Sequence, residues 1–324
     1  MLACGQKAFA AGAIETLMDI FIQQLVNGIT LGAVYAVVAL GYTMVYGIIQ
    51  LINFAHGELV MIGAMVAFTL IGVLTPLGVP ALPAVLVATL CAMTACALLG
   101  YAMERLAYRP LRRAPRLAPL ISAIGVSIIL QHLALLVWSR NPLAFPQIVK
   151  TESFALAGAT ITNIQIGIIV ISVAMMLGLA WLVYRTRLGI AMRATSQNAQ
   201  MAALLGVDAN QVIALTFIIG AALAAVAGVM VGSYYGIAHY TMGSALGLKA
   251  FCAAVLGGIG NIPGAMLGGV LLGLVEALGA GYIGDFTDNV FGSNYQDVFA
   301  FMVLILVLVF RPSGLLGERV GDRA

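Results

Sequence analysis

The chain has 324 residues, of which 62% are hydrophobic and only 8% are charged, and its mean hydropathy is +1.08. A water-soluble domain needs far more charge on its surface, so this composition excludes one. The chain is therefore predicted to be a polytopic membrane protein surrounded by lipid, with no nucleic acid as a partner. Its four cysteines form no CxxC pair and no Cys/His cluster, so neither a metal site nor a disulfide framework is expected.

The predicted membrane spans follow from the charge-free runs, since about 20 apolar residues cross a bilayer. The first coherent apolar pattern opens at Met18, so residues 1–17 are interpreted as an N-terminal extension, and the sequence leaves open whether translation starts at Met1 or Met18. A further apolar piece, Leu246 to Gly258, is too short to cross alone. The spans are expected at about residues 20–47, 59–74, 81–103, 117–138, 164–183, 210–232, 263–284 and 294–310.

The orientation is predicted from the basic residues, because loops rich in lysine and arginine face the cytoplasm. Eleven of the 15 basic residues fall into three clusters. All three lie on one side only if the short apolar piece also carries the chain across, which makes nine crossings with the N-terminus outside and the C-terminus inside. The clusters are Arg105, Arg109, Arg112, Arg113 and Arg116, then Arg185, Arg187 and Arg193, then Arg311, Arg319 and Arg323, while the opposite loops carry Arg140 and Lys150, or Asp285, Asp288 and Asp297.

An internal repeat supports this topology. Residues 27–34 match residues 219–226 at an offset of 192, and the half-helix ending at Gly63 matches the one ending at Gly257. Because the first span runs inward and its partner outward, the halves, at about 20–140 and 205–312, are predicted to have inverted topology. The predicted fold is all-α: a polytopic transmembrane helical bundle with inverted-topology internal repeats and discontinuous helices.

A broken helix is predicted between residues 41 and 64, where a long apolar run is interrupted by Asn53, His56, Gly57 and Glu58 and then resumes. Lipid cannot satisfy free backbone groups, so irregular backbone at membrane depth is expected to be buried in protein or to line a polar cavity. Breaks of this kind commonly mark a transport path. Gly57 is expected to give the backbone freedom to leave helical geometry.

Ionisable side chains inside apolar runs are costly, which makes them functional candidates. Glu58 and Lys249 lie in the two matched half-helices, so one hypothesis is an ion pair between them at the repeat interface. The alternative, weighted equally, is that Glu58 sits at a helix N-terminus, where the helix dipole favours a carboxylate. His132 is interpreted as a packing residue, and no catalytic residue is predicted. The predicted translocation path comprises Asn53, His56, Gly57, Glu58, Lys249, Gly257, Gly258 and Asn261.

A docking helix is predicted in the segment 185–208, which has helix-forming residues after Ser196 and small residues along one face. A solvated loop does not need such a face, whereas small residues three and four positions apart let another protein approach closely. The alternative, a helix lying on the membrane surface, would carry more basic and large apolar residues. The residues assigned to docking are Thr195, Asn198, Ala199, Ala202, Ala203 and Gly206.

Four segments in order, GYTMVYGI, INFAHGE, RATSQNAQMAALLGVD and GGIGNIPGAMLGGVLLGLVE, together resemble the branched-chain amino acid permeases of ATP-binding cassette importers, the LivH type. The resemblance implies a permease domain over residues 18–317, a cytoplasmic tail at 318–324 and a coupling helix at about 190–206. In that helix Ala202, Ala203 and Gly206 resemble the EAA-type small-residue motif. The acidic first position of that motif is absent, so transmission is expected to depend on shape more than on that charge.

The resemblance also implies a bacterial inner membrane, a periplasmic N-terminus and several partners: a second related permease, two cytoplasmic ATPases that hold ATP and Mg, and a periplasmic substrate-binding protein. No lysine follows a glycine, so the chain lacks a GxxxxGK[ST] phosphate loop and is expected to hold no cofactor and to be no enzyme. The implied substrates are leucine, isoleucine and valine, with amides or urea as an alternative. An ion-coupled secondary transporter of amino acids is the rival hypothesis, against which the docking helix argues.

Overall fold

A computed structural model of the whole chain describes residues 2–112, 114–115, 117–156, 158–286 and 295–317, with side chains from residue 18 onward apart from 156 and 283–286. The longer helices are α1 (Leu2–Ile49), α2 (His56–Leu74), α3 (Ala81–Met103), α4 (Leu117–Val137), α5 (Asn163–Arg185), α8 (Ala209–Tyr235) and α10 (Ile262–Phe286). The shorter ones are α6 (Arg187–Gln197), α7 (Ala199–Leu204), α9 (Met242–Gly257) and α11 (Gln296–Phe310), and a π-helical turn, Glu104–Tyr108, and a 3-10 turn, Arg109–Leu111, extend α3.

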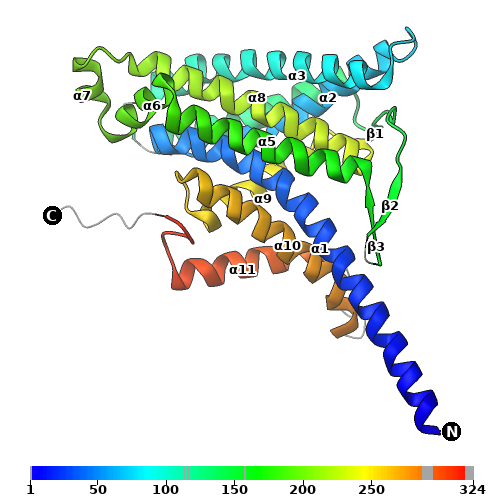
Figure 1. Cartoon of the computed structure of the whole chain (residues 1–324). Coiled ribbons are helices and arrows are strands. Elements are labelled where there is room, and N and C mark those ends of the chain that lie inside the picture. Colours follow the sequence, from blue (N-terminus) through cyan, green and yellow to red (C-terminus); the bar gives the residue numbers. More distant parts are fainter. Residues whose placement is uncertain (1, 113, 116, 157, 287–294, 318–324) are drawn as a thin grey trace.

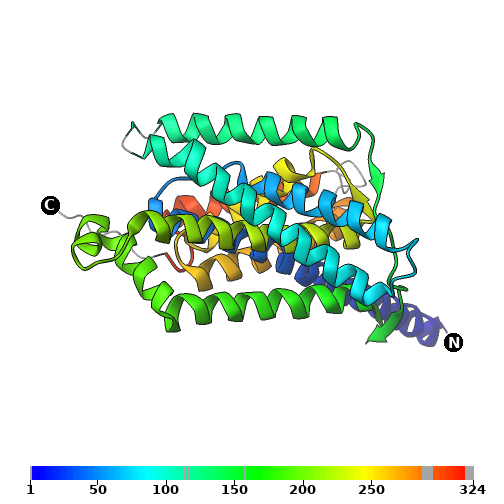
Figure 2. The ribbon, with the colours of Figure 1, turned by 90° about the horizontal axis from the view of Figure 1, so that it is seen from above.

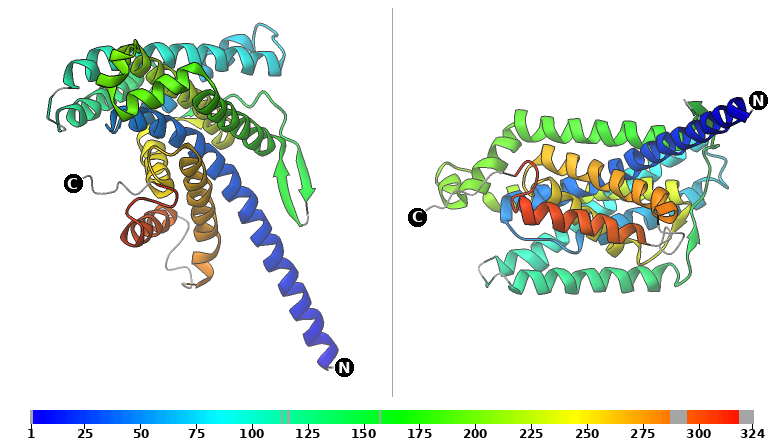
Figure 3. Two further views of the ribbon diagram at one scale, coloured as in Figure 1. Left: turned by 60° about the vertical axis from the view of Figure 1, so that its left-hand side comes forward. Right: turned by 90° about the horizontal axis from the view of Figure 1, so that it is seen from below.

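Helix α1 runs through the middle of the bundle. It packs along α10 and also contacts α8, α9 and α5, while α2 packs between α3, α8 and α9. In Figure 1, α2, α3, α5 and α8 lie on one side of α1, and α9, α10 and α11 lie on the other. The left view of Figure 3 shows the same division, and Figure 2 shows α4 and α5 along the two outer edges of the bundle. The most buried of the long helices are α1, α8 and α2, and the predicted break lies between α1 and α2.

The helices connect two ends of the bundle (Figure 1). The strand end carries four short strands, β1 (Leu143–Ala144), β2 (Ser153–Leu156), β3 (Ala159–Thr162) and β4 (Ile237–Ala238), in two antiparallel pairs, β1 with β4 and β2 with β3. The arginine end carries α6 and α7 together with the described arginines of the three basic clusters. These clusters are thus brought to one end, as the sequence predicts.

Small residues let α3 pack closely against its neighbours. Every fourth residue from Ala84 to Gly100 is small and buried, whereas Leu82, Leu86 and Leu90 on its other faces are exposed. Helix association in a bilayer depends on close packing, which small residues permit. The buried stripe faces α2 and α8 and consists of Ala84, Ala88, Ala92, Cys96 and Gly100.

The predicted spans coincide with observed helices. Among the described residues, seven helices are long and apolar enough to cross a membrane, and α9 and α11 are shorter apolar helices. The short piece predicted at 246–258 lies in α9, which leads from β4 at the strand end to a turn beside the end of α1, where Gly260 approaches Gly47. Counting α9 and α11, the described chain passes between the two ends nine times.

The structure also differs from the prediction in three places. Helix α1 begins at Leu2 and so continues back through the predicted extension. Four short strands, all in connections, accompany the helical bundle. The single docking helix is two helices, α6 and α7. Other predictions fall outside the described residues: those on Arg113, Arg116, Asp288, Arg319, Arg323 and the tail at 318–324, and on the side chain of Asp285.

Candidate functional site

The predicted break is present. Helix α1 ends before Gln50, whose φ of +51° is a left-handed value that stops a helix, and α2 begins six residues later. Asn53 is buried in this gap, and its side-chain oxygen accepts hydrogen bonds from the backbone N–H of Ala55 (3.1 Å) and from the hydroxyl of Tyr108 (2.7 Å). Asn53 therefore fixes the break to the segment that follows α3.

Glu58 lies in the first turn of α2 and is buried. Its Oε1 accepts hydrogen bonds from Ser127 Oγ (3.0 Å) and Gln131 Nε2 (2.7 Å), both on α4. The hypothesis of an ion pair between Glu58 and Lys249 is wrong, because the structure pairs each with other residues. The Glu58 carboxylate is stabilised instead by the N-terminus of α2, as the alternative hypothesis states, and by hydrogen bonds from α4.

Gly57 serves close packing rather than backbone freedom. It lies within α2, at the point where α2 crosses α9. A Cβ atom at Gly57 would collide with the carbonyl oxygen of Gly243 and would lie 2.8 Å from the Cα atom of Gly247. The backbones of the two helices therefore touch here, and the freedom attributed to Gly57 belongs to residues 50–55.

Two buried polar atoms in the first turn of α2, Glu58 Oε2 and His56 Nε2, have no hydrogen-bond partner among the described residues, and a third, Thr43 Oγ1, lies on the side of α1 that faces Val183 and Met192. The His56 ring packs edge-on against Tyr42, with ring centroids 4.7 Å apart. Nearly all buried polar groups in proteins are paired, so unpaired ones need an explanation. The gathering of the first two beside a helix break identifies this region as the main candidate site.

Lys249 belongs to a second polar cluster, on α9, α10 and α11. Its Nζ lies 2.7 Å from Glu276 Oε1 and 2.7 Å from Asp297 Oδ1. The Tyr35 hydroxyl of α1 donates a hydrogen bond to Glu276 Oε2 at 2.9 Å. Glu276 is buried, so the ammonium supplies the counter-charge that a buried carboxylate needs.

The predicted path residues Gly257, Gly258 and Asn261 form the turn between α9 and α10. Gly258 has a φ of +106°, which favours glycine. Asn261 donates a hydrogen bond to the carbonyl oxygen of Leu316 (2.7 Å), and its Oδ1 accepts one from the backbone N–H of Gly264 (3.2 Å). This turn therefore binds the C-terminal segment. Its residues do not belong to the Lys249 cluster.

The segment predicted to dock another protein lies at the arginine end, where Asn198 separates α6 from α7 (Figure 1). The side chain of Asn198 caps α7 by accepting hydrogen bonds from the backbone N–H groups of residues 200 and 201, both at 3.0 Å. Two of the residues assigned to docking, Thr195 and Ala202, are buried and cannot form an outer face. Ala199, Ala203 and Gly206 are exposed, but so are the large apolar side chains of Met201, Leu204 and Leu205.

Comparison with known proteins shows which family the chain belongs to. The sequence profile described as "Branched-chain amino acid transport system / permease component" matches residues 24–308. The chain belongs to this family. It is the permease subunit of a branched-chain amino acid ABC transport system, and such a subunit transports without being an enzyme. The resemblance to the LivH type is confirmed. Of the functions that the sequence left open, the comparisons support the branched-chain amino acid permease over a permease for amides or urea and over an ion-coupled secondary transporter.

The curated relatives match along almost their whole length. The high-affinity branched-chain amino acid transport system permease protein BraD of Pseudomonas aeruginosa is 50% identical over 303 residues, which are 92% of this chain and 96% of that protein. The corresponding protein LivH of Escherichia coli is 45% identical over 306 residues, with the same coverage. Among solved structures, PsaBC from Streptococcus pneumoniae in complex with Fab aligns over 92% of each chain at 16% identity, with a TM-score of 0.43.

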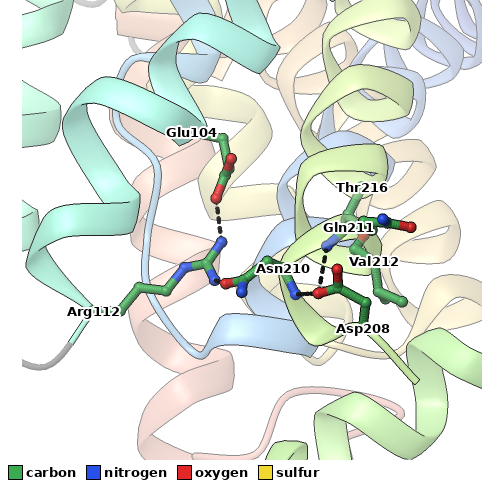
Figure 4. A network of polar contacts seen from close by, with 7 residues as sticks. All are labelled: Glu104, Arg112, Asp208, Asn210, Gln211, Val212 and Thr216. Atoms are coloured by element: carbon green, nitrogen blue, oxygen red, sulfur yellow. Dashed lines mark hydrogen bonds and ion pairs between the residues drawn. The ribbon is translucent and has the colours of Figure 1, made fainter. Parts of the chain in front are cut away.

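A polar network of the permease joins the docking segment to the end of α3 (Figure 4). Arg112 forms an ion pair with the buried Glu104 and donates a hydrogen bond to Asn210 Oδ1 at 2.7 Å. Asp208 caps α8 by accepting hydrogen bonds from the backbone N–H groups of Asn210 (2.9 Å) and Gln211 (3.3 Å). Because α8 follows α7 directly, the start of α8 and the end of α3 are linked at the arginine end.

Sequence reasoning missed several of the permease's site residues. Ser127 and Gln131 are four positions apart on a mostly apolar helix, and that spacing is a signal of one shared polar face. Glu104 is the only acidic residue in the arginine-rich stretch 104–116, which could have identified it. Tyr35 and Tyr108 gave no signal, because a tyrosine in an apolar helix is common packing.

Proposed function

We propose that this permease works with a second related permease, docks two cytoplasmic ATPases through α6 and α7, and receives branched-chain amino acids from a periplasmic binding protein. Substrate would move inward along a path beside the α1–α2 break and the Lys249 cluster. The observation that carries this proposal is the break itself, where buried polar atoms without partners gather between the most buried helices. ATP-driven movement of α7 would reach the break through the start of α8, the Arg112 network and Tyr108, which hydrogen-bonds Asn53.

The connectivity of the helices supports an inverted repeat. Helices α1 and α2 run to the arginine end and back, while α8 and α9 run to the strand end and back. The two halves meet at small residues: Gly41 of α1 lies against the Gly220 backbone of α8, and Gly63 of α2 lies against Ala225. Two related halves that cross in this way provide an interface that can rock, as alternating access requires.

The distribution of arginines supports a cytoplasmic arginine end and a periplasmic strand end. A cysteine placed at the exposed Gln200 of α7 should therefore react with an impermeant maleimide only from the cytoplasmic side, and one at the exposed Lys150 only from outside. Labelling in right-side-out and inverted vesicles measures this. Reaction of Gln200→Cys from the periplasmic side would overturn the orientation, the docking role of α7 and the inward direction together.

The exposed apolar side chains of the docking segment support its contact with another protein. Leu204 and Leu205 are 82% and 83% exposed at the arginine end, and Met201 beside them is 60% exposed. The buried Ala202 holds α7 against the bundle. An apolar patch of this kind is unfavourable in water and typical of a surface that a partner covers.

The proposal predicts that leucine accumulates in proteoliposomes only when the permease pair, the ATPases, the binding protein and ATP are all present. Replacing both Leu204 and Leu205 with aspartate should reduce ATPase copurification and transport at least tenfold, a loss of about 1.4 kcal/mol or more in binding free energy. Radiolabelled uptake and subunit stoichiometry are the measurements.

The matched control is Leu77→Asp, which changes another highly exposed leucine (72%), in the turn between α2 and α3 at the other end of the bundle. It should leave ATPase binding unchanged. Gradient-driven uptake by this permease without ATPases would contradict the proposal, as would normal ATPase binding by the double variant.

A further inference from the structure

A cavity of about 80 Å³ lies at the arginine end, where the last two turns of α1 meet α6 and the turn between α9 and α10. Thr43 and Gly47 line it from α1, Arg193 lines it from α6, and Gly260 and Ile262 line it from the turn and the start of α10. A water molecule needs about 10 to 15 Å³ of such space, so the cavity has room for about five waters or for one small tetrahedral anion.

The hydroxyl of Thr43 is the unusual feature of this cavity. Thr43 is 1% exposed, and its Oγ1 has no hydrogen-bond partner among the described residues. A buried donor without a partner is costly, so a ligand that accepts a hydrogen bond from it explains its presence. Other threonines within the described helices donate to the carbonyl oxygen four residues earlier: Thr30, Thr69, Thr89, Thr94, Thr195 and Thr216.

Arg193 supplies a cation from the side of α6. Its guanidinium stacks on the ring of Tyr184, with Cζ 5.8 Å from the ring centroid, which covers one face of the group and leaves its N–H edge free. The described residues offer those N–H groups no hydrogen-bond or ion-pair partner. Ser196, which also lines the cavity, already donates to the carbonyl oxygen of Arg193 (2.8 Å) and is not counted as a donor to a ligand.

The charges around the cavity favour an anion. The start of α10 carries about half a positive charge from its helix dipole, and the last turn of α1 carries about half a negative charge, so these two contributions cancel. The full charge of Arg193 then decides the sign, because none of the residues that line the cavity is acidic. An anion there also gains the hydrogen bond that the Thr43 hydroxyl lacks.

The cavity lies at the level of the lipid headgroups. Trp181 and Tyr184 are 65% and 47% exposed and lie in the last two turns of α5, which ends at Arg185. Exposed aromatic side chains next to basic ones mark the interface between a bilayer and water. The phosphate groups of phospholipids are the anions concentrated at this level, and basic clusters at the end of a span are typical of sites that bind them.

We propose that this cavity binds a phosphate group, either that of an anionic phospholipid or a soluble phosphate. The phosphate oxygens accept hydrogen bonds from the guanidinium of Arg193 and from the hydroxyl of Thr43, and bonds to an ionised acceptor are the strong kind. The bound phosphate joins α6 to the last turns of α1, directly before the break. It is a resident ligand and not the transported substrate.

The experiment uses the full-length permease, purified with its ATPases in dodecyl maltoside, a detergent without phosphate, and carrying a cysteine in place of Ser196. Labelling of residue 196 by a maleimide is followed by mass spectrometry. Sodium phosphate and dioctanoyl phosphatidylglycerol are added separately, and at least one should slow labelling threefold or more. Slowing by the lipid alone identifies a headgroup, and slowing by sodium phosphate shows that a soluble phosphate suffices.

Two controls test whether the slowing is due to a phosphate in the cavity. Sodium chloride at equal ionic strength and dioctanoyl phosphatidylcholine, which has no net charge, should leave the labelling rate unchanged. Equal slowing by either control would show that salt or lipid merely covers the residue, and would overturn the proposal. Absence of slowing by both phosphate ligands would overturn it as well.

Two substitutions separate binding in the cavity from folding and from any phosphate on the ATPases. Arg193→Gln and Thr43→Val should each weaken protection by about tenfold, the effect of losing one hydrogen bond to a charged group. Thr43→Val removes no hydrogen bond of the protein, so the melting temperature without phosphate should not fall. Unchanged protection in either variant would overturn the site.

Each of these substitutions has a matched control. Arg187→Gln changes an exposed arginine at the start of the same helix, outside the cavity. Thr216→Val changes an equally buried threonine whose hydroxyl already donates to the carbonyl oxygen of Val212. Both should retain full protection by the phosphate ligand, and a loss as large as that in Arg193→Gln would contradict the assignment to this cavity.

Discussion

Replacing Gly57 with leucine is expected to abolish assembly of a stable permease, and transport with it. The backbones of α2 and α9 touch at Gly57, Gly243 and Gly247, so a new side chain meets backbone atoms that cannot move aside. Overpacking of a core costs about 1 to 3 kcal/mol when side chains can adjust, and contacts with backbone lie at the upper end or above. The melting temperature and the yield of the intact complex measure the effect.

Gly72→Leu is the matched control, because Gly72 lies on the same helix and has no atom within 4 Å of an added Cβ. Exchanging that glycine for leucine favours the helix by about 1 kcal/mol and should leave assembly and transport intact. A Gly57→Leu permease that assembles normally would show that α2 and α9 do not cross as described. If it also transported normally, the break would lose its place as the candidate path.

Removing the ammonium group of Lys249 is expected to have the second large effect. Lys249→Met leaves the carboxylate of Glu276, 1% exposed, without a counter-charge, and breaking a buried pair in this way costs about 3 to 5 kcal/mol. The double variant Lys249→Met with Glu276→Gln should recover much of that stability, because no buried charge remains. Thermal unfolding of the purified complex reports both results.

The Lys249 and Glu276 variants form a double-mutant cycle, and a second double-mutant cycle, of Lys249 with Glu58, provides the control for this prediction. Glu58 shares no partner with Lys249, so Glu58→Gln and Lys249→Met should change stability additively, within about 0.5 kcal/mol. For Lys249 and Glu276 the coupling should be of the order of 1 to 3 kcal/mol. Strong coupling with Glu58, or none with Glu276, would contradict the observed pairing.

The position of the break could be predicted because it leaves a local trace in the sequence. Asn53, His56 and Glu58 interrupt an apolar run, and polar groups at membrane depth are rare enough to be noticed. The partner of each charge could not be predicted in the same way. The groups that bind Glu58 lie 69 and 73 residues away on α4, and the choice depends on which helix packs beside α2. Lys249 was likewise assigned to the wrong carboxylate. Its partner Glu276 lies on the next helix, 27 residues further along the chain, but nothing in the sequence shows that the two side chains face each other.

The docking segment shows a different limit of sequence patterns. The small residues were expected to form one outer face of a continuous helix. Asn198 instead ends α6 and caps α7, so the helical phase restarts and Ala202 turns inward while Leu204 and Leu205 turn outward. A cap of this kind has a recognisable residue type, but its effect on which face is exposed follows only once the helix is known to be interrupted.

The two exposed leucines of α7 have a consequence for the turnover of the protein in the cell. On the proposal that α7 docks the ATPases, a permease made in excess of them leaves the exposed side chains of Leu204 and Leu205 uncovered at the arginine end. Exposed apolar side chains are what chaperones and proteases bind on incomplete proteins. If α7 docks the ATPases as proposed, unassembled copies are expected to be removed, and the amount of permease in the membrane should follow the supply of its partners.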